Sequence, residues 1–199
     1  RERVKGKWKT SMTVITMVTF IAFIHYLYMR DLWVTMQVSP VSYRYIDWMI
    51  TVPLQIVEFF LILNAVGKVP GAVFWRLLIA SVVMLVAGYI GEAGLGNAMV
   101  YFAIGMLGWL TILYEIFYGE AASISGGLKS KPTKIAFNGL RLIVTVGWAI
   151  YPIGYVYGYM LPDPNIDAVN IIYNFADFIN KIAFGLIIWH AAVLESAAE

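Results

Sequence analysis

The sequence predicts an all-α membrane protein, a polytopic bundle of helices that crosses the bilayer several times. Of its 199 residues, 61% are hydrophobic and only 13% are charged, whereas about a quarter of a typical soluble domain is charged. The apolar runs are long and continuous, unlike the alternating apolar and polar residues of membrane β-barrel strands. The length fits one compact bundle, so we expect residues 1–199 to form a single transmembrane domain.

Six stretches are apolar enough and long enough to cross a bilayer as helices. The segments between them are rich in glycine, proline, serine and charged residues, which is typical of loops. We expect the spans at about 11–29, 42–63, 73–90, 98–118, 135–160 and 169–194.

The composition excludes several classes of function. The absence of cysteine rules out disulfides, thiol catalysis and cysteine-based metal sites. The two histidines, His25 and His190, are too few for a histidine-built metal centre, so we expect no metal. The net charge is only +2 and the basic residues lie at span ends, where membrane topology places them. We therefore expect no nucleic-acid partner.

Basic residues concentrate in segments that would share one side of the membrane. Cytoplasmic loops of membrane proteins carry an excess of lysine and arginine. The Arg1 end and the Gly119–Lys134 loop are therefore expected in the cytoplasm. The basic residues on this side are Arg1, Arg3, Lys5, Lys7, Lys9, Lys68, Lys129, Lys131 and Lys134.

The second span contains an arginine and two acids, Arg44, Asp47 and Glu58. A charge at bilayer depth costs at least about 2.5–3.5 kcal/mol, so such residues normally face a partner or a water path. Thr51 lies one turn after Asp47, and Glu58 lies about three turns after it, within roughly 20° of the same face and about 16 Å along the axis. One helix face therefore carries an acid, a hydroxyl and a second acid, an order that resembles a proton-transfer pathway.

The last span pairs Asp177 with Lys181, four residues apart and therefore on one helix face. Lys181 is near mid-bilayer, where a lysine needs a carboxylate partner or a covalent use. A desolvated lysine is also the residue type that forms Schiff bases with carbonyl cofactors. The alternative is an ion pair that only fixes packing.

Aromatic residues lie well inside the spans rather than at the membrane interface, where they usually gather. For any one of them, core packing is the more ordinary explanation. Several tryptophans around one buried lysine nevertheless favour a flat, conjugated ligand. The aromatic residues concerned are Trp48, Trp109, Trp148 and Tyr151, and Pro152 follows the last of them.

Several short stretches together resemble the microbial rhodopsins, and among these the proteorhodopsins. The resemblance covers essentially the whole chain, and the combination is specific although each piece alone is modest. The matching stretches are RYIDW, TVP and Glu58 in the second span, GWAIYP at Gly147–Pro152, DFINK at Asp177–Lys181, KWKT at Lys7–Thr10, GEAG at Gly91–Gly94 and FGLIIW at Phe184–Trp189.

The resemblance implies a fold of seven helices, one more than the six spans found here. The segment Arg1–Lys9 is similar to the cytoplasmic loop that follows the family's first helix. We therefore expect that this helix is missing from the sequence, rather than that the protein has a native six-helix form.

The resemblance also implies roles for the charged residues. Lys181 would bind all-trans retinal as a protonated Schiff base. Asp47 would be its main counterion and proton acceptor, and Asp177 the second counterion, with Arg44 below both. Glu58 would return a proton from the cytoplasmic side, because burial lets a carboxyl group hold its proton until it is needed. The order Asp47, Thr51, Glu58 resembles the pattern of outward proton pumps.

The same resemblance assigns the walls of the cofactor pocket. Trp48 and Trp148 would sandwich the polyene, while Tyr151, Pro152 and Trp109 would line the rest. Gln55 lies about 80° around the helix from Asp47 and would flank the cofactor. Glutamine here resembles the blue-absorbing type and leucine the green; the alternative is a helix–helix hydrogen bond without spectral effect.

Four further residues at or near span ends need an assignment. His25 matches a histidine that bonds the counterion in proteorhodopsins; the alternative is an interfacial histidine bonded to a backbone carbonyl. His190 is expected to be interfacial. Glu92 and Glu115 receive no role, and we expect them to be solvated or interfacial acids.

The predicted function is a light-driven outward proton pump in the bacterial inner membrane, a transporter and not an enzyme. By resemblance we expect a homo-oligomer, a pentamer or hexamer. A photosensory rhodopsin that signals to a membrane partner is the main alternative, and Glu58 argues against it because sensors often lack a cytoplasmic donor carboxylate. A membrane scaffold that binds no cofactor is the third possibility.

Overall fold

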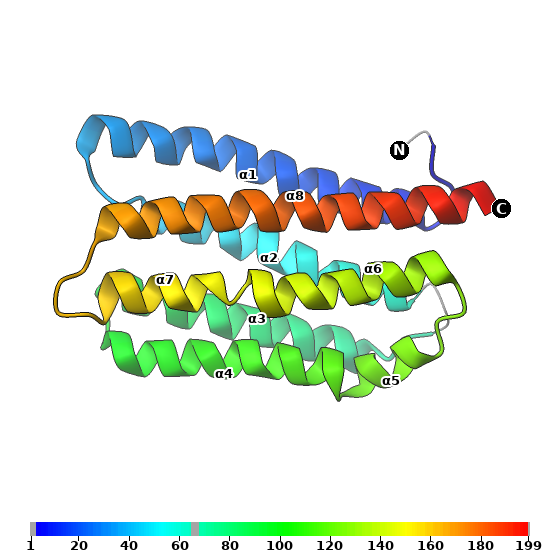
Figure 1. Cartoon of the computed structure of the whole chain (residues 1–199). Helices are drawn as coiled ribbons and strands as arrows, with labels where there is room; N and C mark the ends of the chain where they lie inside the picture. The colour runs from blue at the N-terminus through cyan, green and yellow to red at the C-terminus, as the bar shows by residue number, and fades with distance from the viewer. Residues whose placement is uncertain (1–2, 65–67, 199) are drawn as a thin grey trace.

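The structure, a computed structural model, describes residues 3–64 and 68–198, and within them it contains helices and short connections only (Figure 1). The predictions that involve Arg1 lie outside the described residues. In chain order the elements are α1 (Trp8–Met36), α2 (Val41–Leu63), α3 (Gly71–Glu92), α4 (Ala98–Phe117), α5 (Glu120–Gly126), α6 (Lys131–Leu142), the π-helix η1 (Ile143–Gly147), α7 (Ile150–Tyr159) and α8 (Ile166–Ala198).

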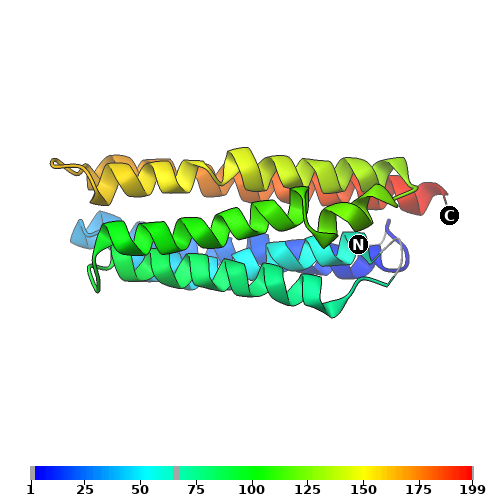
Figure 2. The ribbon, with the colours of Figure 1, turned by 90° about the horizontal axis from the view of Figure 1, so that it is seen from below.

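These elements build six long rods that run side by side. The described part of the chain has six helical segments long and apolar enough to cross a membrane, with α4 and α5 forming one and α6, η1 and α7 forming another. Figure 2 shows α6, α7 and α8 on one side of the bundle and α1 to α4 on the other. The predicted all-α membrane bundle with six spans is confirmed.

The two ends of the bundle can be told apart by their connections (Figure 1). The first described residues and the end of α8 lie at one end, which we call the terminal end. The opposite end, which we call the distal end, carries the connections 37–40, 93–97 and 160–165. Described lysines that flank or begin the helices at the terminal end are Lys5, Lys7, Lys9, Lys68, Lys129, Lys131 and Lys134.

The interior of the bundle contains charged and polar groups among its apolar side chains, and its surface carries many large apolar side chains. Large apolar side chains such as Phe20, Trp75 and Leu107 are more than half exposed, as expected of a surface that faces lipid. Arg44 and Asp47, in contrast, have no exposed surface. Buried charge inside a membrane bundle marks a site of function more often than a site of packing.

The first helix is longer than predicted. The predicted span ends at about residue 29, but α1 continues through the charged pair Arg30–Asp31 to Met36. It ends at Gln37, whose φ of 54° is left-handed and whose N–H donates to Trp33 O at 3.1 Å. A charged pair near a membrane surface is compatible with a helix, so it is a poor sign of where the helix ends.

The fifth long helical segment, formed by α6, η1 and α7, is interrupted by a π-helix that the sequence did not predict. The wider turns of a π-helix leave backbone carbonyl groups free for other partners. Val144 O accepts a hydrogen bond from Trp109 Nε1 at 2.9 Å, and Gly147 O accepts one from Asn180 Nδ2 at 2.9 Å. A Cβ on Gly147 would lie 2.0 Å from Asn180 Oδ1, so a larger residue here would displace the Asn180 side chain. The interruption fixes the position of Trp148, the next residue.

Candidate functional site

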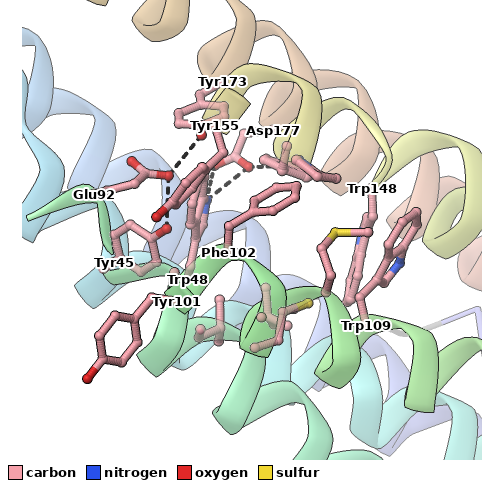
Figure 3. Close-up of a pocket in the computed structure, with 18 of the residues that line it drawn as sticks. Tyr45, Trp48, Glu92, Tyr101, Phe102, Trp109, Trp148, Tyr155, Tyr173 and Asp177 are labelled. Atoms are coloured by element: carbon pink, nitrogen blue, oxygen red, sulfur yellow. Dashed lines mark hydrogen bonds between the residues drawn. The ribbon is translucent and has the colours of Figure 1, made fainter. Parts of the chain in front are cut away.

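A cavity lies inside the bundle, between the two groups of helices (Figure 3). Its walls come from α2, α3, α4, α7 and α8, and they are mainly apolar and aromatic. Residues singled out from the sequence that line this cavity are Trp48, Gln55, Trp109, Trp148, Tyr151, Pro152, Asp177 and Lys181. The structure therefore brings the predicted pocket residues together around one space.

Lys181 sits between two acids that come from different helices. Its side chain is almost fully buried, and Nζ donates hydrogen bonds to Asp47 Oδ2 of α2 and to Asp177 Oδ2, the latter at 2.9 Å. One cation thus faces two carboxylates in an apolar interior. Because an unpaired charge there would be costly, each of these groups depends on the other two.

Asp177 is held by donors from four helices. Besides Lys181, it accepts hydrogen bonds from Tyr26 OH at 2.8 Å, from Trp48 Nε1 at 3.0 Å and from Tyr151 OH at 2.5 Å. Hydrogen bonds to a carboxylate stabilise its charged form. Tyr26 is a contributor that the sequence analysis missed.

Asp47 is held by fewer donors than Asp177. Lys181 is its one hydrogen-bond donor among the described residues, and Oδ1 has none. His25 Nδ1 lies 3.3 Å from Oδ1, within ion-pair distance but outside hydrogen-bond geometry. His25 therefore lies next to Asp47 without the expected hydrogen bond, and one Asp47 oxygen remains available. Thr51, one turn further along α2, is fully buried and its hydroxyl has no partner among the described residues.

Glu58 is fully buried in the terminal half of the bundle. Neither of its carboxyl oxygens has a hydrogen-bond partner among the described residues, although the Ser11 side chain of α1 is close enough to interact with it. Phe59 and Ile62, its neighbours on α2, belong to the apolar core. A carboxyl group in such surroundings is costly when charged.

Arg44 reaches away from Lys181 toward the distal end. It has no exposed surface, and Nη2 donates to Asn170 Oδ1 at 2.6 Å. Its guanidinium carbon lies 5.0 Å from the centre of the Tyr173 ring. No hydrogen bond joins it to Asp47 or Asp177 among the described residues, so it acts on them through space only.

The aromatic walls are fixed by contacts from neighbouring helices. Trp48 packs edge-on against Tyr45, Tyr151 and Tyr173, with ring centres 5.0–5.3 Å apart. Trp148 is almost fully buried and lies beside Trp109 (Figure 3). These rings form a rigid lining, which suits a flat ligand.

Gln55 and His190 differ in their surroundings. Gln55 is 2% exposed, lines the cavity, and its Nε2 has no partner among the described residues. The helix–helix hydrogen bond considered as an alternative is thus not formed by this amide nitrogen. His190 is exposed toward the terminal end of α8.

Glu92 and Glu115 are buried, so the expectation that they are solvated was wrong. Glu92 is 7% exposed and accepts hydrogen bonds from Tyr45 and Tyr173. Glu115 is 5% exposed and accepts two hydrogen bonds from Arg76, each at 3.0 Å. Both acids lie near helix ends, but side chains of neighbouring helices cover them.

Comparisons with known proteins point to one family. The sequence model of the family described as bacteriorhodopsin-like protein matches residues 1–194. The chain is 51% identical to the blue-light absorbing proteorhodopsin of Gamma-proteobacterium Hot 75m4, over 99% of this chain and 79% of the relative. It is also 51% identical to the green-light absorbing proteorhodopsin of Gamma-proteobacterium EBAC31A08, with the same coverage. Equal identity does not separate the blue type from the green.

The fold agrees with this relationship. The crystal structure of blue light-absorbing proteorhodopsin from Med12 superimposes with a TM-score of 0.85 at 55% identity, over 98% of this chain and 88% of that chain. That of Exiguobacterium sibiricum rhodopsin superimposes with a TM-score of 0.86 at 36% identity, over 100% and 89%. The chain therefore belongs to the proteorhodopsins of the bacteriorhodopsin-like family, which are multi-pass membrane rhodopsins and not enzymes.

Proposed function

We propose that this protein is a light-driven outward proton pump that binds all-trans retinal on Lys181 as a protonated Schiff base. The observation that carries the proposal is the position of Lys181 Nζ, which bridges Asp47 and Asp177 at the wall of an aromatic cavity. Membership of the rhodopsin family supports a retinal chromophore.

The lining of the cavity suits such a ligand. Pockets for small molecules are usually lined by apolar and aromatic side chains with a few polar groups. The lining here is of this kind, and Lys181 provides an amine in the wall. Bound there, retinal would supply the absorption of visible light and a change of shape that moves the proton-bearing nitrogen.

Asp47 would accept the proton from Nζ of Lys181. Its Oδ1 has no hydrogen-bond donor, so a new O–H bond can form there without breaking an existing contact. Asp177 would remain charged, because three donors besides Lys181 hold it. The two acids would thus share one cation but play different roles.

Glu58 would return a proton to Nζ from the other side. It lies on the same helix as Asp47, about 16 Å further toward the terminal end. Its apolar surroundings stabilise a carboxyl group that carries a proton. The proton can leave only when Nζ offers a better acceptor, which gives the cycle its order.

The direction of transport follows from the charges at the two ends. The lysines of the terminal end support a cytoplasmic position for it, because cytoplasmic segments are enriched in basic residues. Asp47 then faces outward relative to Glu58. We extend the proposal to a bacterial inner membrane, to a homo-oligomer of five or six chains and, because of Gln55 beside the cavity, to the blue-absorbing type.

Acidification of the medium tests the proposal. Cells that express the protein and receive all-trans retinal should gain a visible absorption band that hydroxylamine bleaches, and should acidify the medium when illuminated. Lys181→Ala should lack both properties. Acidification by that variant would overturn the proposal, and a coloured protein whose photocycle lasts many seconds without acidification would indicate a photosensor.

A further inference from the structure

Arg141 is a cation within a membrane span, and no acid of the described chain pairs with it. It lies near the end of α6, and its side chain is partly exposed. Among the described residues no carboxylate is within ion-pair distance of its guanidinium. The acids at the end of α4 and the start of α5, Glu115 and Glu120, pair with Arg76 instead. Because an arginine side chain cannot lose its charge in a protein, Arg141 needs an anion from elsewhere.

The groups that hold the Arg141 side chain are all neutral. Nη1 donates to Asn138 Oδ1 at 3.3 Å, and Nη2 donates to Ser125 Oγ of α5 at 3.1 Å. The guanidinium carbon lies 4.4 Å from the centre of the Phe137 ring and 5.2 Å from that of Phe117 on α4. Ring faces attract a cation but do not neutralise it. Nε is buried and has no partner among the described residues. The guanidinium is thus positioned by three helices and keeps free N–H donors.

The Arg141 side chain extends toward the terminal end of the bundle. Its contacts Phe137 and Asn138 lie one turn earlier on α6, which starts at the terminal end (Figure 1). Its third contact, Ser125, belongs to α5, the short helix that precedes the connection into α6. Long basic side chains near the ends of membrane spans extend in this way to reach the lipid headgroups. The guanidinium therefore points to the headgroup layer at the terminal end.

The surface around Arg141 changes from basic to apolar along the helix. Lys134 is exposed and lies seven residues before Arg141, within about 20° of the same face. Beyond Arg141, toward the middle of the span, Leu142 is 63% exposed and Val146 is 62% exposed. A cation, a second cation one step closer to the headgroups and an apolar strip below them match the shape of a phospholipid, which has a charged head and apolar chains.

We propose that Arg141 binds the phosphate group of an anionic phospholipid at the terminal end, with an acyl chain of this lipid along Leu142 and Val146. The planar guanidinium suits a phosphate because it can donate two parallel hydrogen bonds. Basic sites between membrane helices are a known way to hold anionic headgroups. Since Arg141 also contacts α4 and α5, the bound lipid would stabilise the packing of these helices against α6. The proposal does not depend on the pumping function.

Native mass spectrometry of the full chain in detergent tests the lipid preference. With equal amounts of phosphatidylglycerol and phosphatidylcholine, the wild type should retain phosphatidylglycerol at least about fivefold more often. Arg141→Met, which keeps the length of the side chain but removes its charge, should lose this preference. Arg141→Lys should keep part of it, because the charge remains without the planar fork. Lys9→Met is the matched control, since it removes an exposed cation of the terminal end from α1, and it should behave as the wild type.

Thermal denaturation in vesicles gives a second readout that does not depend on the stability of the variant itself. Adding phosphatidylglycerol to phosphatidylcholine vesicles should raise the midpoint of the wild type by about 2–4 °C and leave that of Arg141→Met unchanged.

Four results would overturn the proposal. They are equal retention of the two lipids by the wild type, an unchanged preference in Arg141→Met, an equal loss in Lys9→Met, and the same rise in midpoint when inorganic phosphate replaces phosphatidylglycerol. The last result would identify a site for a free anion. A changed oligomer size in Arg141→Met without a change in lipid preference would also overturn it, because a second copy of the chain would then supply the anion.

Discussion

The two halves of the bundle interior hold their acids in opposite ways. In the distal half, Asp177 accepts hydrogen bonds from four residues and Glu92 from two. In the terminal half, Glu58 is equally buried but accepts no hydrogen bond from any described residue. Burial alone therefore does not define the role of an acid here. The number of donors around it separates a fixed charge from a group suited to hold and give up a proton.

The largest effect is expected for Lys181→Ala, which removes the cation that contacts both Asp47 and Asp177. The variant should bind no retinal covalently and show no visible absorption band. Asp47 and Asp177 would then face each other without a bridging cation, which costs several kcal/mol. Visible spectroscopy after addition of retinal measures the first effect, and thermal denaturation in detergent measures the second. A stable coloured variant would show that Lys181 is not the attachment site.

Asp47→Asn should abolish outward transport but keep the pigment. The amide cannot take up a proton from Nζ, whereas Asp177 still provides a negative charge beside it. Light-driven pH changes in cell suspensions measure this loss. His25→Gln is a useful comparison, because His25 lies 3.3 Å from Asp47 without a hydrogen bond. The loss of transport in His25→Gln should be partial. Complete loss in this variant would indicate that His25, rather than Asp47, accepts the proton.

Glu58→Gln should slow the return of the proton to Nζ without affecting its departure. General acid catalysis by a positioned side chain typically contributes about 10²–10⁴-fold, so a delay of at least about a hundredfold is expected. Flash photolysis separates the two steps. Ser11→Ala, which changes the polar neighbour of Glu58 but keeps the acid, should have a smaller effect. Equal delays in both variants would argue that the surroundings of Glu58, rather than its carboxyl group, set the rate.

Tyr26→Phe tests the donors around Asp177. It removes one hydrogen bond to a buried carboxylate, worth about 1.5 kcal/mol of stability. Transport should continue, because Trp48, Tyr151 and Lys181 still hold Asp177. Thermal denaturation and light-driven pH changes check the two expectations separately. Loss of transport with unchanged stability would contradict the view that Asp177 is only a fixed charge.

The smallest effect is expected for Glu120→Gln at the terminal end. Glu120 and Arg76 form an ion pair at 2.7 Å, but both side chains are about two-fifths exposed. Exposed ion pairs contribute about 0–1 kcal/mol. Transport and colour should match the wild type, while denaturation shifts little. A large loss of function would show that the connection through α5 matters for the cycle.

Some of this arrangement was predictable from the sequence, and its limits have physical causes. The six spans follow from apolar length, and the faces that carry Asp47 and Lys181 follow from helical spacing. Contacts between distant segments do not follow from such rules. Tyr26 and Asp177 are 151 residues apart, and Tyr173 and Glu92 are 81 apart. The tyrosine bonded to Asp177 and the burial of Glu92 were therefore visible only in three dimensions.

The π-helix was missed for a related reason. Its residues are ordinary for an apolar span, and periodicity does not distinguish an α-helical turn from a wider one. What stabilises the wider turn is a pair of side chains from other helices, Trp109 and Asn180, which bond the freed carbonyl groups. A sequence pattern within one span contains no information about them.

The most direct test of the central claim is to identify which acid takes the proton when it leaves Lys181 Nζ. Time-resolved infrared spectroscopy records the carbonyl band that a carboxyl group gains on protonation. We predict that this band rises with proton departure in the wild type, persists in any pigment formed by Asp177→Asn, and is absent in Asp47→Asn. A band that survives in Asp47→Asn and disappears in Asp177→Asn would contradict the account.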